Sequence, residues 1–102
     1  MTMDYKLLIY SNANDINPID DNVDVEIKLD NGETYVATFF TLENIKKIFN
    51  RYEITGECAN GLYLWSENMI FIENLSEEIV RKSIDDLIES GEVYTAFKKI
   101  NT

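Results

Sequence analysis

Histidine is absent from the 102-residue sequence, and cysteine and proline each occur once. Without histidine, the chain lacks the side chain that most often exchanges protons near neutral pH and is the commonest ligand of transition metals. A Cys–His nucleophilic pair cannot form within the chain. The lone Cys58 cannot form an internal disulfide, and its position beside Glu57 in TGECANG predicts an ordinary loop or half-buried cysteine.

The motifs of several other site classes are also missing. Adjacent acidic residues occur at three places, but neighbours on a strand or helix point apart, so none forms the carboxylate pair that glycosidases use. Asp20, Asn22 and Asp24 alternate as in a calcium loop, yet Val25 stands where such a loop needs glycine. TGECANG lacks the lysine of a phosphate-binding loop. We therefore predict a protein that is not an enzyme and that binds neither a metal nor a cofactor.

Long apolar runs are missing as well. No stretch approaches the roughly 20 apolar residues that span a bilayer. The start, MTMDYKLLIYSN, lacks the basic leader and the long apolar stretch of a signal peptide. Together with the single cysteine, which is typical of a reducing compartment, these features predict a cytoplasmic protein without membrane contact.

Basic residues are few, and the acidic excess is uneven. Nineteen acidic residues outnumber nine basic ones, which gives a net charge of −10. Residues 11–40 carry seven acids against Lys28 alone, whereas residues 41–55 carry three bases against two acids. Such a surface repels nucleic acid and anionic lipid and attracts basic proteins. We therefore expect no direct binding of nucleic acid, and a basic protein as the partner.

The apolar content is sufficient for one core. Hydrophobic residues make up 45% of the chain, which argues against a disordered protein, and the length predicts a single compact domain over residues 1–102. Period-two alternation, turn residues and helical spacing divide the chain into elements. The expected strands are residues 5–10, 22–30, 34–40, 62–65 and 69–73, and the expected helices are residues 42–53, the segment between Ser76 and Gly91, and a short helix over 92–100.

These elements predict an α+β fold. It comprises an antiparallel sheet of four to five strands, built from two hairpins, with the two main helices on one face, in the order (β)ββαββα. Thr41 and Ser76 are the expected N-caps of the main helices, and Gly91 is the expected stop of the second. Tyr63 and Trp65 belong to a segment that is apolar on both faces, which predicts that they pack in the core.

The turn at Asn31-Gly32 decides which side chains share a face of the first hairpin. If these two residues form a two-residue turn, Asp24 lies opposite Phe39 and Lys28 opposite Tyr35, and opposite residues point to the same face. The acidic side of the first strand would then lie beside two aromatic rings, a combination found at protein interfaces. A bulged turn would shift the register by one residue and reverse the faces. The partner-binding residues expected on the first register are Asp24, Glu26, Asp30, Glu33, Tyr35 and Phe39.

In its size, its acidity, its lack of catalytic residues and its α+β layout over residues 20–100, the chain resembles the small acidic immunity proteins of bacterial toxin systems. Its abundance of Ile, Asn, Lys and Glu is typical of AT-rich bacterial genomes and their phages. The resemblance implies a non-enzymatic inhibitor that binds one cognate toxin, commonly a basic nuclease, and blocks its active site or substrate path. Carboxylates on the hairpin would pair with the lysines and arginines that a nuclease uses to hold phosphates.

Three other functions remain open. The first is a phage-encoded decoy that imitates nucleic acid to block host defence, for which the acidic stretches 15–33 and 85–92 provide charge. The second is a housekeeping module whose acidity serves solubility, with a homodimer joined through the open face of the sheet. The third is a small enzyme that works with carboxylates alone.

Overall fold

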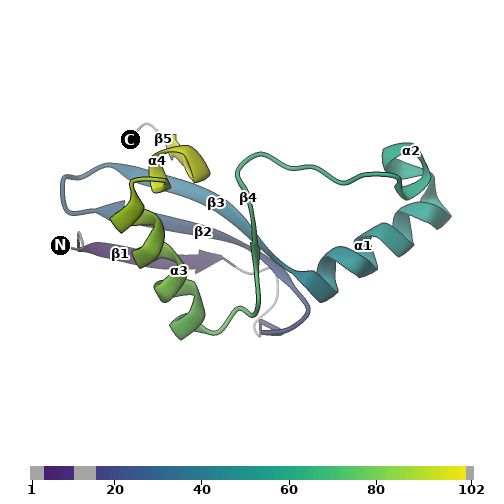
Figure 1. Cartoon of the computed structure of the whole chain (residues 1–102), viewed down its shortest axis with the longest axis horizontal. Helices are drawn as coiled ribbons and strands as arrows, with labels where there is room; N and C mark the ends of the chain where they lie inside the picture. The colour runs from purple at the N-terminus through teal and green to yellow at the C-terminus, as the bar shows by residue number, and fades with distance from the viewer. Residues whose placement is uncertain (1–3, 11–15, 101–102) are drawn as a thin grey trace.

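The computed structural model of the protein describes residues 4–10 and 16–100, and it has an α+β architecture with a five-stranded sheet (Figure 1). The predicted fold class is therefore confirmed. The elements follow one another as β1 (Tyr5–Tyr10), β2 (Asn22–Leu29), β3 (Thr34–Thr41), α1 (Leu42–Thr55), α2 (Glu57–Gly61), β4 (Met69–Ile72), α3 (Glu77–Ser90), α4 (Val93–Ala96) and β5 (Lys98–Ile100).

The sheet has the order β1-β2-β3-β4, and β5 also pairs with β3. Strand β2 pairs antiparallel with β1 on one side and with β3 on the other. The far edge of β3 is divided between two strands: β4 pairs parallel with Thr38–Thr41, and β5 pairs antiparallel with Thr34–Val36. Strand β3 is therefore the centre of the sheet along its whole length.

The chain after α1 differs from the sequence-based expectation. Residues 62–65 are not a strand, so the second hairpin is absent, and β4 runs parallel to β3. A parallel pair needs a long crossover, which here consists of α1, α2 and the segment that returns to β4. The expected helix over 92–100 is also wrong in part, because only Val93–Ala96 is helical and Lys98–Ile100 joins the sheet.

The turn between β2 and β3 is bulged, which corrects the two-residue turn expected at Asn31-Gly32. The amide of Leu29 donates to the Glu33 carbonyl at 2.8 Å, and the amide of Gly32 donates to the Leu29 carbonyl at 3.0 Å. Gly32 has a φ of +90°, a conformation that suits glycine because it lacks a Cβ. The loop is one residue longer than expected, so every side chain of β3 lies on the face opposite to the predicted one.

The core lies between one face of the sheet and α3 with α4 (Figure 1). Phe39 meets Phe97 edge to face, with ring centroids 5.9 Å apart, and the Tyr5 hydroxyl donates to Asp85 of α3 at 2.8 Å. This side of the sheet is covered over β2 and β3, while the inward side chains of β1 are half-buried. The buried side chains are Val23, Val25, Ile27, Leu29, Tyr35, Ala37, Phe39, Ile72, Leu75, Val80, Ile84, Val93 and Phe97.

Residues 42–68 form an arm that leaves the sheet at the end of β3 (Figure 1). Helix α1 points away from the strands, α2 turns the chain at the outer end, and residues 62–68 return to β4. The radius of gyration is 14.6 Å, compared with about 12.8 Å for a compact domain of this length. The arm therefore elongates the molecule, whose extents are 46 × 25 × 24 Å.

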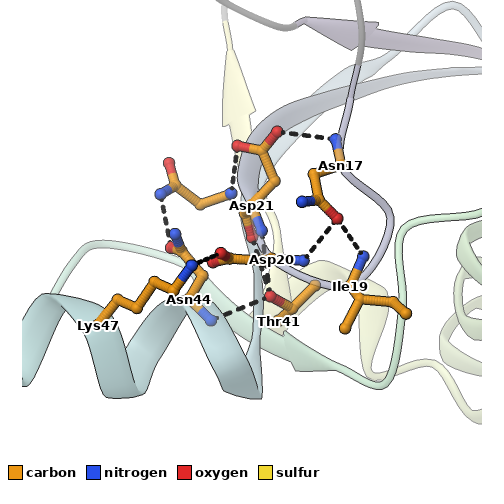
Figure 2. A network of polar contacts seen from close by, with 8 residues as sticks. Asn17, Ile19, Asp20, Asp21, Thr41, Asn44 and Lys47 are labelled. Atoms are coloured by element: carbon orange, nitrogen blue, oxygen red, sulfur yellow. Dashed lines mark hydrogen bonds and ion pairs between the residues drawn. The ribbon is translucent and has the colours of Figure 1, made fainter.

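A polar network holds the base of the arm (Figure 2). The Thr41 hydroxyl accepts from the amide of Asn44 at 3.2 Å, as predicted for an N-cap, and also from the amide of Asp21 at 3.2 Å. Asn22 donates to the Asn44 side chain at 2.7 Å, and Lys47 forms an ion pair with Asp20. These contacts join the loop before β2 to the first turns of α1, so the direction of the arm is set at its base.

Candidate protein-binding face

The face of the sheet opposite the core is here called the open sheet face. Helices α3 and α4 pack on the other side of the sheet, and the base of α1 reaches this face only at its end, where Asn22 donates a hydrogen bond to Asn44 (Figure 1). Along each strand, its side chains alternate with those that enter the core. Residues that lie opposite one another on neighbouring strands form rows across this face. One row consists of Tyr10, Asp24, Thr38 and Met69, and the next consists of Leu8, Glu26, Val36 and Lys98.

Two carboxylates lie in the middle of this face, on β2. The Thr38 hydroxyl donates to Asp24 at 2.8 Å, and the Tyr10 hydroxyl makes a long hydrogen bond of 3.5 Å to Glu26. Within the described part of the chain, neither carboxylate forms an ion pair. Each keeps oxygen lone pairs that can accept hydrogen bonds from a partner.

Large apolar side chains surround these acids. Leu8, Tyr10 and Phe71 are exposed by 51%, 51% and 59% respectively. Leu8 and Tyr10 lie on β1 directly opposite the two carboxylates, and Phe71 lies beside Phe40 at the other side of the face. Exposed aromatic and aliphatic groups next to carboxylates are the composition expected of a protein interface rather than of an ordinary solvated sheet.

A cavity of about 450 Å³ opens on the same face, at the place where β4 and β5 meet along β3. Its walls come from three segments: the strands β1 to β3, the end of the return segment, and β5. Asn68 shapes one wall, since its carbonyl accepts from the Thr38 amide and its side chain donates to the Ala96 carbonyl, both at 3.0 Å. The polar groups at the cavity are those of Tyr10, Asp24, Thr38, Ser66, Glu67, Asn68 and Lys98.

The open sheet face is mixed in charge, which refines the acidic face that the sequence predicts. Lys6 and Lys28 lie opposite each other near the hairpin turn, and Lys98 forms a 3.4 Å ion pair with Glu67 at the cavity. The second half of α3 is more strongly acidic, and its last turn contains no base. The acids there and just beyond the helix are Asp85, Asp86, Glu89 and Glu92.

The structure brings together only part of the predicted binding set. Asp24 and Glu26 share the open sheet face, whereas Asp30 is exposed in the hairpin turn. Tyr35 and Phe39 are 5% and 0% exposed. Their prediction as exposed aromatics is wrong because the bulged turn rotates β3 so that both rings enter the core.

Glu33, the remaining predicted residue, belongs to a separate cluster at the edge of the sheet. Lys99 pairs with it at 2.6 Å, and Asn31 and Tyr35 donate to it at 3.0 and 3.3 Å. The hydrogen bond from Lys99 holds the pKa of Glu33 below its usual value, and the pKa of Lys99 is raised by the same pair. The negative charge of Glu33 is therefore already balanced by Lys99 within the chain.

Several residues of the site are missed by sequence reasoning. Tyr10 and Leu8 alternate with the half-buried side chains of β1. This period-two signal is weak because the strand is short and of mixed composition. Phe71 and Glu67 reach the face only because β4 is parallel to β3. Trp65 and Tyr63 were expected in the core, but they are exposed on the arm.

No group of three histidine, cysteine or acidic side chains that could hold a metal ion occurs in residues 4–10 and 16–100. Over the same residues, none of the helices has both the length and the apolar character needed to cross a bilayer. Comparisons with protein-family models, with curated proteins and with solved structures found no match to this chain. The geometry of the open sheet face is therefore the main indication of function.

Proposed function

We propose that the protein is a non-enzymatic inhibitor of the immunity-protein kind, which binds a basic toxin or nuclease through its open sheet face. One observation is central to this proposal: on the open sheet face, Asp24 and Glu26 form no ion pair within the described residues. The exposed side chains of Tyr10 and Leu8 lie directly opposite them. Exposed apolar patches on soluble proteins often mark sites of protein interaction.

The face offers two kinds of contact to a basic partner. Leu8, Tyr10 and Phe71 supply apolar area, which contributes most of the affinity of a protein interface. Asp24 and Glu26 accept charge-assisted hydrogen bonds from arginine or lysine, which are shorter and stronger than neutral ones. The cavity beside Asp24 has room for a long basic side chain. The net charge of −10 adds long-range attraction that speeds the encounter at low salt.

The test compares two variants that change the net charge by the same amount. The first removes both charges from the open sheet face (Asp24→Asn with Glu26→Gln), and the second removes two from α3 (Asp86→Asn with Glu89→Gln). Each protein is tagged and used to capture proteins from its native host at low and high salt. We expect one stoichiometric basic partner, bound at least ten-fold more weakly by the open-face variant and unchanged by the α3 variant.

A captured nuclease or toxin is then assayed with increasing amounts of the wild-type protein. Inhibition that is complete at a one-to-one ratio supports the proposal. A partner whose activity is unaffected at saturation contradicts the inhibitor function, and equal binding of wild-type protein and open-face variant contradicts the site. Folding of each variant is checked by circular dichroism, and both should fold because the replaced side chains lie on the surface.

The acidic end of α3 favours one second candidate, the decoy that imitates nucleic acid. Its four acids follow one another over residues 85–92 without a base in the last helical turn, which is unfavourable for the helix dipole. A decoy would use this surface to bind a DNA-binding protein. The same experiment separates the two functions, since the α3 variant rather than the open-face variant would then lose the captured partner.

A further inference from the structure

The outer end of the arm carries four of the ten large hydrophobic side chains that are exposed in the described part of the chain. Ile54, Leu62, Tyr63 and Trp65 are exposed by 87%, 81%, 52% and 69% respectively. All four lie within residues 54–65, here called the arm tip, which carry Glu57 as their one charged group. The arm tip is on the side of the molecule away from α3 and β5 (Figure 1), so it is separate from the acidic surface described above.

The arm leaves most of its own apolar side chains half-buried or exposed. Of the 14 residues of α1, only Ile48 is buried, and an isolated helix of this length is marginal in water. The end of α2 packs closely on α1, since a Cβ placed on Gly61 would lie 2.9 Å from the Phe49 carbonyl oxygen. The arm therefore consists of α1, α2 and the returning segment, and its exposed side chains show that no other described element covers the arm tip.

The turn that closes the arm is held in an unfavourable conformation. Cys58, Ala59 and Asn60 have φ values of 50°, 55° and 62°, in the left-handed region. Such a conformation costs a non-glycine residue about 1–2 kcal/mol, and strained residues of this kind persist where surrounding contacts hold them. A neighbour that covers Leu62 and Ile54 on either side of the turn would supply such contacts.

We infer that the arm tip is the contact surface between two copies of this chain, which join arm to arm around a two-fold axis. The first reason is the distribution of charge. Residues 42–68 carry four acids and three bases, a net charge of −1, so the other 75 residues carry −9. Arm-to-arm contact joins the two nearly neutral parts and places the strongly acidic parts of the two copies far apart, whereas pairing through the acidic end of α3 brings like charges together.

The second reason is the available area. If each large side chain presents about 150–250 Å², the four residues of the arm tip expose on the order of 600 Å², which is most of the ~800 Å² that one partner contributes to a standard interface. Because a two-fold contact uses the same patch twice, no second apolar surface is required. A basic protein is the poorer occupant, since the arm tip has only one acid, and an anionic membrane is repelled by the charge of −10.

This inference is independent of the proposed function. The open sheet face lies on the strands, and its cavity is lined by the strands and by Ser66, Glu67 and Asn68, which directly follow the arm tip. The arm tip itself lines neither surface, so the inferred dimer does not use the residues that would bind a partner. Failure of one proposal leaves the other standing, because the two surfaces share no residue.

The test uses Trp65, the only tryptophan of the chain, as a reporter inside the proposed contact. Sedimentation velocity and tryptophan emission are measured from nanomolar to high micromolar protein. We expect a monomer-to-dimer transition accompanied by a blue shift of the emission, at the same protein concentration in both measurements. The variant Ile54→Ser with Leu62→Ser should raise the concentration at the midpoint at least ten-fold, while the control Leu8→Ser, on the open sheet face, should not change it.

Two results would overturn the inference. One is a monomer with constant, solvent-exposed tryptophan emission over the whole concentration range. The other is a dimer that is broken by Leu8→Ser but not by the arm-tip variant, which would place the contact on the open sheet face. Because Ile54 and Leu62 are highly exposed, their replacement by serine should leave the fold of the monomer intact. Circular dichroism of the variant tests this.

Discussion

Helices α1 and α3 have nearly the same local design but very different surroundings. Each has 14 residues, begins after a hydroxyl N-cap and ends at a glycine with a left-handed φ. Helix α3 lies on the sheet and completely buries Val80 and Ile84, whereas α1 leaves the sheet and fully buries only Ile48. Amphipathic spacing and caps are thus sufficient to form a helix, but they do not decide how much of its apolar stripe is covered.

This difference predicts an uneven distribution of stability. The sheet with α3 contains nearly all of the buried side chains, and such regions exchange their amide protons only on global unfolding. The arm has few buried apolar contacts, so its amides should exchange through local opening. The following substitutions compare the two regions directly, from the largest expected effect to the smallest.

The largest difference is expected between two isoleucines. Ile84→Ala removes a fully buried side chain of α3 and should lower the free energy of unfolding by about 3–4 kcal/mol, through lost transfer energy and the cavity left behind. Ile54→Ala removes a side chain that is almost fully exposed, and it should change the stability of the monomer by less than about 0.5 kcal/mol. Urea denaturation at submicromolar protein measures both; similar losses for the two would contradict the division between body and arm.

Two glycines with positive φ provide the next comparison. Gly61→Ala forces a Cβ to within 2.9 Å of the Phe49 carbonyl oxygen, whereas a Cβ on Gly91, at the end of α3, meets nothing within 4 Å. We expect Gly61→Ala to lower the free energy of unfolding by about 2–3 kcal/mol and Gly91→Ala to lower it by about 1 kcal/mol. The second substitution strains only the left-handed backbone. Hydrogen exchange should show that Gly61→Ala destabilises the arm. Equal losses would mean that the end of α2 does not pack on α1.

Replacing the two N-caps should also have unequal effects on stability, with the larger loss at the N-cap of α1. Thr41 is fully buried, and its hydroxyl accepts from two amides and donates to the Asp21 carbonyl at 3.3 Å. Ser76 is exposed and accepts from the amide of Ile79 alone, at 3.3 Å. Thr41→Ala should therefore cost about 2 kcal/mol, and Ser76→Ala about 1 kcal/mol. Thr41→Ser serves as the control, because it keeps the hydroxyl and should recover most of the loss in the same denaturation measurement.

The smallest effect concerns pH. Burial, together with the hydrogen bond to Asp85, raises the pKa of Tyr5 from 10.0 to about 12. Because the protonated phenol is favoured in the folded state, its contribution to stability is complete below pH 10 and is lost as the pH rises toward 12. Asp85→Asn should move the Tyr5 titration back toward 10, as measured by NMR of the labelled ring. A titration that stays near 12 in this variant would assign the shift to burial alone.

The candidate site was only partly predictable, and the hairpin shows why. Alternation in β2 correctly assigns Asp24 and Glu26 to one face and Val25 and Ile27 to the other, because both depend on the strand alone. The face of Tyr35 depends on whether the turn contains two or three residues, and Asn31-Gly32 is compatible with both. A difference of one residue moves Tyr35 and Phe39 from the predicted interface into the core.

Local chemistry, readable in the sequence, determined the α+β class, the strands β2 and β3, the capped ends of α1 and α3 and the charge of −10, since each depends on neighbouring residues or on composition. Tertiary structure decided the turn register, the parallel pairing of β4 and the direction of the arm. These depend on contacts between residues far apart in the chain, such as Thr41 with Asp21 and Thr38 with Asn68. The physical reason is that alternative registers and crossovers satisfy the same local preferences and differ only in which surfaces they bury together.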